Sequence, residues 1–304
     1  MTARKSSAST SRKSTRSTTR SEPQGRASKA QRPAAWTADD LGFAGDSGAL
    51  EHYADPRYYD HAYRDRAHDV AWYLALAQSL GGPVLEYGAG NGRVSLALAR
   101  AGIDVVALDL SKPMLASLVE RLRCEAPAVR RRVRAVYGDM VSHALRRRFP
   151  LVIAPFNVVL HLYTPDEISG FLARVRAHLA PKGTFAFDFS LPQPEDLARD
   201  PKRRYRAPRF RHPSTGQLVR YAERFEYDPL RQLLTVWMEF APEGGPPWTV
   251  PLTHRQFFPQ EMRGWLRGAG FADVRYTADF AASAPDAGVD SLVVQARLAR
   301  QSRF

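Results

Sequence analysis

Val84-Leu-Glu-Tyr-Gly-Ala-Gly-Asn-Gly-Arg93 is the stretch of sequence that decides the fold of this chain. Its first residues, Val84–Glu86, have the character of a short buried strand, and Arg93–Ala101 have the spacing of the helix that follows it. Between them, three glycines at alternate positions let the backbone turn sharply and approach a ligand that any Cβ would block. The helix adds unpaired N–H groups and the positive end of its dipole. The loop therefore predicts a ligand site at the carboxyl edge of a parallel sheet.

An acidic residue at the end of the next apolar run indicates which kind of ligand binds there. The run Ile103–Leu108 leads to Asp109, seventeen residues after Gly92, where an acid can accept hydrogen bonds from both hydroxyls of a ribose. Glu86 stands two positions before the first glycine, and its carboxylate would repel a pyrophosphate, which disfavours NAD and FAD. The pattern favours a nucleoside ligand without phosphate. The alternative is that the glycines only let the strand and the helix pack closely.

Length and composition limit the class of protein. With 304 residues, 44% of them hydrophobic, the chain can bury a large core, and we expect one large domain or one domain with a small insertion. The single cysteine, Cys124, excludes a disulfide framework and indicates a reducing compartment, for which we expect the cytoplasm. No apolar run approaches the roughly 18 residues of a membrane-spanning helix, so we expect no membrane partner.

The first 35 residues carry most of the net charge of +13. They hold nine Lys or Arg against one acid, and they are rich in Ser and Thr without any Leu, Ile, Val or Phe. Such a segment cannot bury an apolar face, so we expect a disordered basic tail over residues 1–35. We favour a solvated tail, and the alternatives are an arm that binds nucleic acid and a targeting segment.

Beyond the tail, strands and helices alternate with short connections, which predicts a doubly wound α/β domain. Further strands are expected at residues 132–137, 149–157 and 184–188, and helices at residues 67–80, 111–122 and 165–179. Residues Val219–Tyr227 and Leu233–Phe240 instead alternate with a period of two and predict a hairpin, with another strand at Val250–Phe258. A helix at 259–269 and strands at 272–277 and 291–297 would complete the main sheet.

The predicted fold class is therefore α/β, with a Rossmann-like sheet of seven strands and a small antiparallel insertion after the fifth strand. The expected division is a tail at 1–35, an N-terminal helical lid at 36–80, a core at 81–190, an antiparallel cap at 191–258, and a C-terminal helix with the last two strands at 259–304. A cap inserted at this point would cover the open edge where ligands bind.

The pattern E-x-G-x-G-x-G at residues 86–92, with an acid ending the next strand, resembles the class I methyltransferases that use S-adenosylmethionine (SAM). The resemblance covers about residues 50–300 and is clearest from Tyr58 to Asp188, where the chain is similar to glycine N-methyltransferase and to sugar-amine N-methyltransferases. It implies SAM as the cofactor, no metal, a small-molecule acceptor, and a cap that covers this acceptor.

The resemblance also implies which residues bind SAM. They are Glu86, Gly88, Gly90, Gly92, Asp109, Leu110, Met114, Asp139, Met140, Tyr59, Arg64 and Arg66. Asp139 would bind the adenine amino group with Met140 beside the ring, and the alternative is that Gly138-Asp139 only forms a turn. Leu110 and Met114 would pack on the adenine, or else simply belong to the core.

The segment Tyr59–Arg66 resembles the lid of those N-methyltransferases, in which tyrosines and an arginine close over SAM. Either Arg64 or Arg66 would offer a bidentate guanidinium to the methionine carboxylate. The sequence leaves the choice between them open.

The segment Phe156–Leu162 resembles the part of these enzymes where an Asn and a His face the methyl group. Asn157 and His161 are four residues apart, which puts both on one face if the segment turns helically. A substrate ammonium must lose a proton before it can react, and a histidine has a suitable pKa for this step. The alternative is a core or capping histidine. Candidates for the acceptor pocket, unless they only pack together, are Tyr53, Tyr58 and Tyr163.

The loop after the fourth strand also bears on the acceptor. Methyltransferases that act on amino groups of nucleic-acid bases or of protein glutamine typically carry Asn or Asp, two prolines and an aromatic residue there, and Ala154–Asn157 does not match. We therefore predict methyl transfer to a small molecule, with an amine preferred to a hydroxyl. The alternatives are an RNA or protein methyltransferase docked by its basic tail, and a protein that binds SAM without catalysis.

Overall fold

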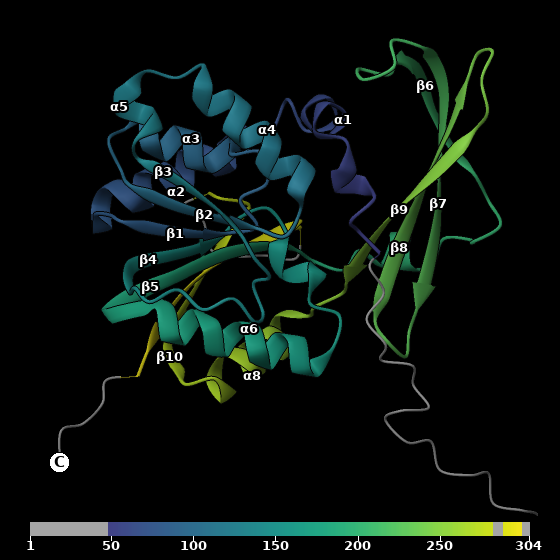
Figure 1. The fold of residues 1–304 in the computed structure, drawn as a ribbon. Helices are drawn as coiled ribbons and strands as arrows, with labels where there is room; N and C mark the ends of the chain where they lie inside the picture. Colours follow the sequence, from purple (N-terminus) through teal and green to yellow (C-terminus); the bar gives the residue numbers. More distant parts are fainter. Residues whose placement is uncertain (1–47, 282–287, 300–304) are drawn as a thin grey trace, which may run out of the picture. The chain divides into compact units, whose positions relative to one another are not determined.

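The computed structural model describes residues 48–281 and 288–299, and Figure 1 shows their fold. The predicted tail at residues 1–35 and the first part of the predicted lid lie outside the described residues. The described part contains a seven-stranded sheet in the order β10-β11-β5-β4-β1-β2-β3, which confirms the predicted fold class. Its strands are β1 (Val84–Tyr87), β2 (Val105–Asp109), β3 (Val133–Tyr137), β4 (Phe149–Ala154), β5 (Leu179–Ser190), β10 (Phe271–Ala278) and β11 (Ser291–Leu298).

Five neighbouring strands, from β3 through β2, β1 and β4 to β5, run parallel, and β11 and β10 continue the sheet in antiparallel fashion. After β1, the chain adds β2 and β3 on one side of that strand, and it then crosses back to add β4 and β5 on the other side. In such open sheets, ligands bind beyond the carboxyl ends of the strands at the point where the strand order reverses. The topology therefore predicts a ligand site at the loops after β1, β2 and β4.

Helices cover both faces of the sheet, so β1 is buried along its whole length. Leu85 and Tyr87 belong to one apolar cluster, and Val84 belongs to the cluster on the opposite face, as the alternation of a strand requires. The first cluster includes residues of α6 (Pro165–His178) and α8 (Pro259–Gly268). The second includes residues of α2 (His68–Leu80), α3 (Arg93–Arg100) and α4 (Lys112–Arg123).

Local signals explain where two of these helices begin. The Ser111 hydroxyl accepts a hydrogen bond from the Met114 N–H at 3.4 Å, which caps the N-terminus of α4. At α6, Thr164 and Glu167 form a capping box: the Glu167 N–H donates to the Thr164 hydroxyl at 3.2 Å, and the Thr164 N–H donates to the Glu167 carboxylate at 2.8 Å. Both helices thus begin beside the carboxyl edge of the sheet.

A separate antiparallel sheet follows β5, in the order β6-β7-β8-β9. Its strands are β6 (Tyr205–Arg211), β7 (Leu218–Asp228), β8 (Leu233–Pro242) and β9 (Trp248–Arg255). The sequence predicts three of these strands. The fourth, β6, escapes prediction because three of its seven residues are arginines, it contains Pro208, and it forms an exposed edge strand with a bulge between Ala207 and Phe210.

The ends of β4 and β5 also differ from expectation. The predicted fourth strand reaches Asn157, whereas β4 ends at Ala154 because Phe156 and Asn157 both take a φ of 62°. The fifth strand is longer than predicted and follows α6 directly. The remaining short elements are the 3₁₀ helices η2 (His52–Ala54) and η3 (Val158–His161) and the helices α1 (Pro56–Ala62), α5 (Pro127–Arg130) and α7 (Pro194–Leu197). Across residues 48–281 and 288–299, every helix is too short or too polar to cross a membrane.

Candidate active site

A cavity of about 430 Å³ lies at the carboxyl ends of β1, β2, β3 and β4. It brings together most of the residues that the sequence singles out. Those that line it are Tyr53, Tyr59, Glu86, Gly88, Gly90, Asp109, Leu110, Met114, Asp139, Met140, His161 and Tyr163. Five candidates are not among the lining residues: Gly92, Arg64, Arg66, Asn157 and Tyr58.

The three glycines after β1 do different work. All have positive φ, from 56° to 87°, which glycine adopts without strain. A Cβ on Gly88 would lie 2.3 Å from a methyl group of Val158, and a Cβ on Gly92 would lie 2.3 Å from one of Leu118. Gly92 therefore serves close packing of the loop on α4, whereas Gly88 and Gly90 also form the wall of the cavity.

Asp109 ends β2 with its carboxylate oriented by the backbone. The Gly90 N–H donates to one carboxylate oxygen and the Ser111 N–H to the other, each at 2.7 Å. Burial raises the pKa of Asp109, and these hydrogen bonds oppose that shift. A carboxylate oxygen can accept more than one hydrogen bond, so both oxygens can still receive a ligand hydroxyl.

Glu86 is almost fully buried, and burial raises its pKa to about 8. The Ser95 hydroxyl donates to its carboxyl group. Near pH 7 the Glu86 carboxyl group therefore holds a proton. A neutral carboxyl group repels a pyrophosphate less than the ionised carboxylate that we expect from the sequence. A positively charged ligand group beside Glu86 would lower this pKa again.

Asp139, Met140, Leu110 and Met114 lie around the cavity at the ends of β2 and β3. Asp139 accepts the Val141 N–H at 2.8 Å, so it does form the turn that the sequence offers as an alternative. Met114 is buried, whereas Leu110 is 46% exposed. An exposed leucine at the mouth of a cavity is an apolar surface on which a planar ring can pack.

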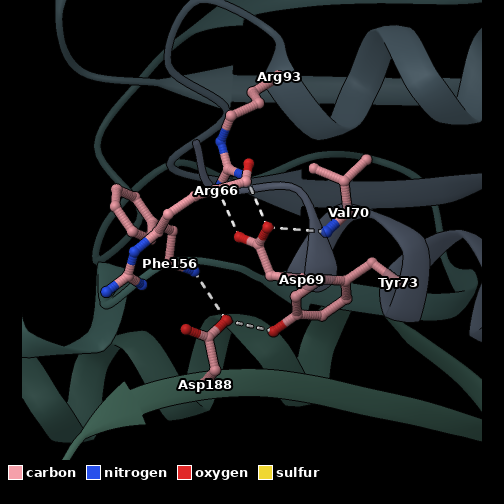
Figure 2. A network of polar contacts seen from close by, with 7 residues as sticks. All are labelled: Arg66, Asp69, Val70, Tyr73, Arg93, Phe156 and Asp188. Atoms are coloured by element: carbon pink, nitrogen blue, oxygen red, sulfur yellow. Dashed lines mark hydrogen bonds and ion pairs between the residues drawn. The ribbon is translucent and has the colours of Figure 1, made fainter. Parts of the chain in front are cut away.

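Arg93, at the first position of α3, is the arginine of the cavity, and sequence reasoning misses it. Its guanidinium makes two bonds to the fully buried Asp69, at 2.7 and 2.6 Å, and the Val70 N–H holds the same carboxylate at 2.8 Å (Figure 2). The Phe156 ring lies 4.9 Å from the guanidinium carbon of Arg93. The feature of the sequence that could have identified Arg93 is its position directly after the third glycine.

The two arginines that the sequence offers lie elsewhere. Arg64 is mostly exposed and contacts His61 and Asp65. Arg66 lies over the Phe156 ring at 4.9 Å (Figure 2). Neither lines the cavity, so the open choice between them has no support from the geometry.

Two polar atoms beside the glycine loop are left for a ligand. Asn91 lines the cavity, and its amide nitrogen donates to Asp60 at 2.8 Å, but its amide oxygen is buried without a hydrogen-bond partner among the described residues. The Nε of Arg93 is also buried without such a partner within the described part of the chain. An unpaired buried acceptor and an unpaired buried donor are costly. Together they fit a ligand that carries both an ammonium and a carboxylate.

His161 lies at the other side of the cavity, between two tyrosines. Its Nε2 is 2.8 Å from the Tyr53 hydroxyl and its Nδ1 is 3.3 Å from the Tyr163 hydroxyl. Because the Tyr163 hydroxyl donates its proton to the Thr253 carbonyl at 3.0 Å, the proton between Tyr163 and His161 belongs to Nδ1. Nε2 therefore accepts from Tyr53. Burial lowers the pKa of His161 to about 4, so the imidazole is neutral.

Asn157 does not accompany His161 into the cavity. Its side-chain oxygen accepts the Ser190 N–H at 2.7 Å, and its amide nitrogen donates to the Ser190 hydroxyl at 3.1 Å. The segment turns helically only from Val158, after two residues of positive φ, and this turns Asn157 toward β5. Asp188 holds the same loop, since its carboxylate accepts the Phe156 N–H at 2.7 Å and the Tyr73 hydroxyl at 2.6 Å (Figure 2).

The inserted sheet contacts two residues of the cavity wall through β9. The His254 ring lies 5.0 Å from the His161 ring, and the Thr253 carbonyl receives the Tyr163 hydroxyl. Tyr58, by contrast, stacks on His212 of the segment after β6 at 5.2 Å and packs against Phe240. Sequence reasoning gives no sign of His254, because nothing in the chain marks which residue of β9 faces His161.

Comparison with known proteins adds sequence and structural similarity to this geometry. Residues 84–183 match the family described as a methyltransferase domain. Cypemycin N-terminal methyltransferase from Streptomyces sp is 33% identical over 123 residues, which are 40% of this chain and 48% of that protein. The match therefore spans about half the length of this relative.

Solved structures match over most of the chain. The CcbJ methyltransferase from Streptomyces caelestis has a TM-score of 0.65 at 27% identity, over 78% of this chain and 98% of that chain. The glycopeptide N-methyltransferase MtfA complexed with SAM has a TM-score of 0.52 at 25% identity, over 77% of this chain and 96% of that chain. The fold of most of the chain therefore recurs in solved methyltransferase structures.

Proposed function

Since this chain is a class I methyltransferase that uses SAM, we propose that it transfers the methyl group to an amine nitrogen of a small molecule or peptide. The observation that carries this proposal is the neutral His161 beside Tyr53. When bound, SAM would supply a methyl group on a positively charged sulfur. An electron pair of the acceptor would attack the methyl carbon in line with the carbon–sulfur bond that breaks. The residues of the chain bind both partners and orient them.

The cofactor end of the cavity comprises Glu86, Asn91, Arg93, Asp109 and Asp139. Asp109 would accept the ribose hydroxyls, since its oxygens are already oriented by the backbone. The unpaired oxygen of Asn91 suits the α-ammonium of the methionine part, and the unpaired Nε of Arg93 suits its carboxylate. These assignments keep the sequence prediction for Asp109 and replace Arg64 and Arg66 by Arg93.

The acceptor end of the cavity comprises Tyr53, His161 and Tyr163, and His254 packs against the His161 ring. A pKa of about 4 makes His161 a hydrogen-bond acceptor near pH 7 and a weak base. Its Nε2 holds the Tyr53 hydroxyl proton, and the Tyr53 oxygen can then accept an N–H of a neutral amine and so aim the nitrogen lone pair at the methyl group. His161 cannot retain the proton of an ammonium, so the amine must enter neutral or release its proton to water.

The same weakness supports an amine over a hydroxyl. A neutral amine keeps a nucleophilic lone pair while it donates an N–H to the Tyr53 oxygen that His161 orients. An alcohol needs a base that removes most of its proton as it attacks, and a base with a pKa of about 4 gives little help with that. His161 therefore suits orientation of an amine better than activation of an alcohol.

Matched acceptors test the proposal. Each pair shares one carbon skeleton and differs only in an amine or a hydroxyl, such as an amino sugar and its parent sugar, or a peptide with a free N-terminus and its α-hydroxy analogue. We expect methylated product by mass spectrometry from amines alone, at a rate that rises with pH as the fraction of neutral amine grows. Comparable transfer to the hydroxyl partners would contradict the amine assignment. SAM binding without product from any acceptor would leave a protein that binds the cofactor without catalysis.

A further inference from the structure

A second cavity, of about 520 Å³, lies at the opposite edge of the parallel sheet. Three arginines line this cavity: Arg134, the second residue of β3, and Arg146 and Arg147, which lie three and two positions before β4. Parallel strands begin at one edge of a sheet and end at the other. The cavity near the starts of β3 and β4 is therefore remote from the one that receives SAM.

The cavity exists because the connection between β3 and β4 contains no helix. Residues 138–148 cross this face as a loop, so the end of the sheet at β3 lacks the helical cover that α6 gives its neighbours. The loop is nonetheless held in place: the Leu145 N–H donates to His178 Nε2 at 2.9 Å, and His178 Nδ1 contacts the Tyr87 hydroxyl at 2.6 Å. These hydrogen bonds fix the position of the backbone from which Arg146 and Arg147 extend.

Positive charge accumulates at this edge without matching acids. Seven arginines occupy residues 130–134 and 146–148. Within residues 48–281 and 288–299, Arg132 is the member of this group with an ion pair, to Asp104 at 2.9 Å. No acidic side chain is among the described residues that line the cavity, where Arg134, Arg146 and Arg147 are joined by His143. Guanidinium groups held near one another repel, and a bound anion would relieve that repulsion.

The chemistry and the spread of these arginines indicate the kind of anion. A guanidinium fork matches the geometry of a phosphate and can bind it through two parallel N–H groups. The arginines extend beyond the cavity to Arg130, Arg131 and Arg148, which suits a row of phosphates better than a single one. Phe149 also lines the cavity but is fully buried, so it offers no surface on which a base could stack.

We propose that this arginine edge (Arg130–Arg134 and Arg146–Arg148) binds the phosphate backbone of a nucleic acid, independently of base sequence. The arginine edge is separate from the methyl-transfer site, so its role is the same whatever the acceptor is. The basic residues 1–35 are identical in all the proteins compared, so any contribution they make to binding is constant.

The test compares two triple variants of the full chain that lose equal charge. One carries Arg134→Gln, Arg146→Gln and Arg147→Gln. The other carries Arg206→Gln, Arg220→Gln and Arg263→Gln, three exposed arginines of β6, β7 and α8. Binding of a fluorescently labelled single-stranded RNA is measured by anisotropy over a range of salt concentrations. We expect the first variant to bind about tenfold or more weakly, with a salt dependence reduced by about two released counterions, and the second to bind like the unaltered chain.

Further arms separate the remaining outcomes. SAM affinity should be equal in all three proteins, which also verifies that the variants fold. Equal loss of RNA binding in both variants would overturn the proposal, since net charge alone would then explain it. If pyrophosphate displaces the RNA at a concentration no higher than that of the RNA phosphate groups, the cavity instead binds a small phosphate ligand. Binding to phosphatidylserine vesicles that needs Arg134, Arg146 and Arg147, without RNA binding, would assign it to an anionic lipid surface.

Discussion

The two ends of the active-site cavity are held in different ways. At the cofactor end, one continuous stretch provides most groups, and backbone N–H groups orient Asp109 across the loop from Gly90. At the acceptor end, Tyr53, His161 and His254 come from η2, η3 and β9, and they meet only through side-chain contacts. At the first end the backbone of the glycine loop sets much of the geometry, although Asp69 and Asp60 hold Arg93 and Asn91 from farther along the chain. The second end, where we place the acceptor, depends on how separate elements pack.

Replacing Arg93 by leucine should have the largest effect, because it removes the partner of the fully buried Asp69 at the cofactor end. Breaking a buried ion pair on one side typically costs about 3–5 kcal/mol of unfolding free energy. Urea denaturation of the protein without ligand measures this loss. The double variant Arg93→Leu with Asp69→Asn should recover much of it, and equal stability of the single and double variants would refute the buried-charge explanation.

Glu86→Gln tests the other buried acid of the cofactor end through pH. The pKa of Glu86 is raised to about 8 from an ordinary value near 4.5, so the unfolded state releases this proton at lower pH than the folded state. The associated stability is present below about pH 4.5 and is lost as pH rises toward 8, by roughly 3 kcal/mol or more. The variant should lack this loss. Parallel pH profiles of stability for the two proteins would contradict the shifted pKa.

His161→Ala addresses the acceptor end and should separate it from the cofactor end. We expect turnover to fall on the order of 10²-fold, the scale of misplacing a reacting group, with SAM affinity unchanged. Tyr53→Phe, which removes the hydroxyl that donates to Nε2, should give a smaller fall. Steady-state kinetics and calorimetry measure the two quantities. Unchanged turnover would remove His161 from the mechanism.

Asp109→Ala is the complementary change at the cofactor end. We expect SAM to bind more weakly by about 1–3 kcal/mol, the usual loss when a partner of a buried polar group is removed. Asp104→Ala is the matched control, since Asp104 precedes the same strand and pairs with Arg132 at the opposite edge. Calorimetric titration of both variants with SAM gives the comparison. Equal affinities would exclude Asp109 from ribose binding.

Asn157→Ala should have the smallest effect and sharpens the boundary of the acceptor end. Since Asn157 makes its two hydrogen bonds to Ser190, its removal should cost about 1 kcal/mol of stability and lower turnover only through the position of the loop. A double-mutant cycle with Ser190→Ala should show strong coupling between the two residues. A large fall in turnover from Asn157→Ala alone, without such coupling, would place Asn157 at the methyl group.

Much of the main sheet can be predicted from the sequence, because its strands are short apolar runs between helices with clear periodicity. The cap is predicted less completely. The edge strand β6 is charged and bulged, and neither property produces the alternation that marks a half-buried strand. The ends of β4 show another limit, since consecutive left-handed residues at Phe156 and Asn157 depend on Asp188 and Ser190, more than 30 positions away.

The candidate site divides in the same way. Glycine spacing and the acid at the end of the next strand are local features, so Asp109 and the loop around Gly90 can be predicted. Arg93 cannot, because an arginine in the first turn of a helix has the appearance of a solvated residue until Asp69 is found beside it. The lid arginines Arg64 and Arg66 illustrate the reverse case, in which a resemblance selects residues that the structure places outside the cavity.

The sequence by itself determined the class of fold through the local periodicity of its strands and helices, and the glycine loop through backbone geometry that glycine adopts easily. Through the resemblance that this loop and Asp109 carry, it also indicated SAM as the cofactor. The tertiary structure alone decided which arginine faces the cavity, where Asn157 points, and that Tyr53 meets His161. Those contacts join residues far apart in the chain, 108 positions for Tyr53 and His161 and 115 for Tyr73 and Asp188. Packing of whole elements sets such distances, and no short stretch of sequence contains that information.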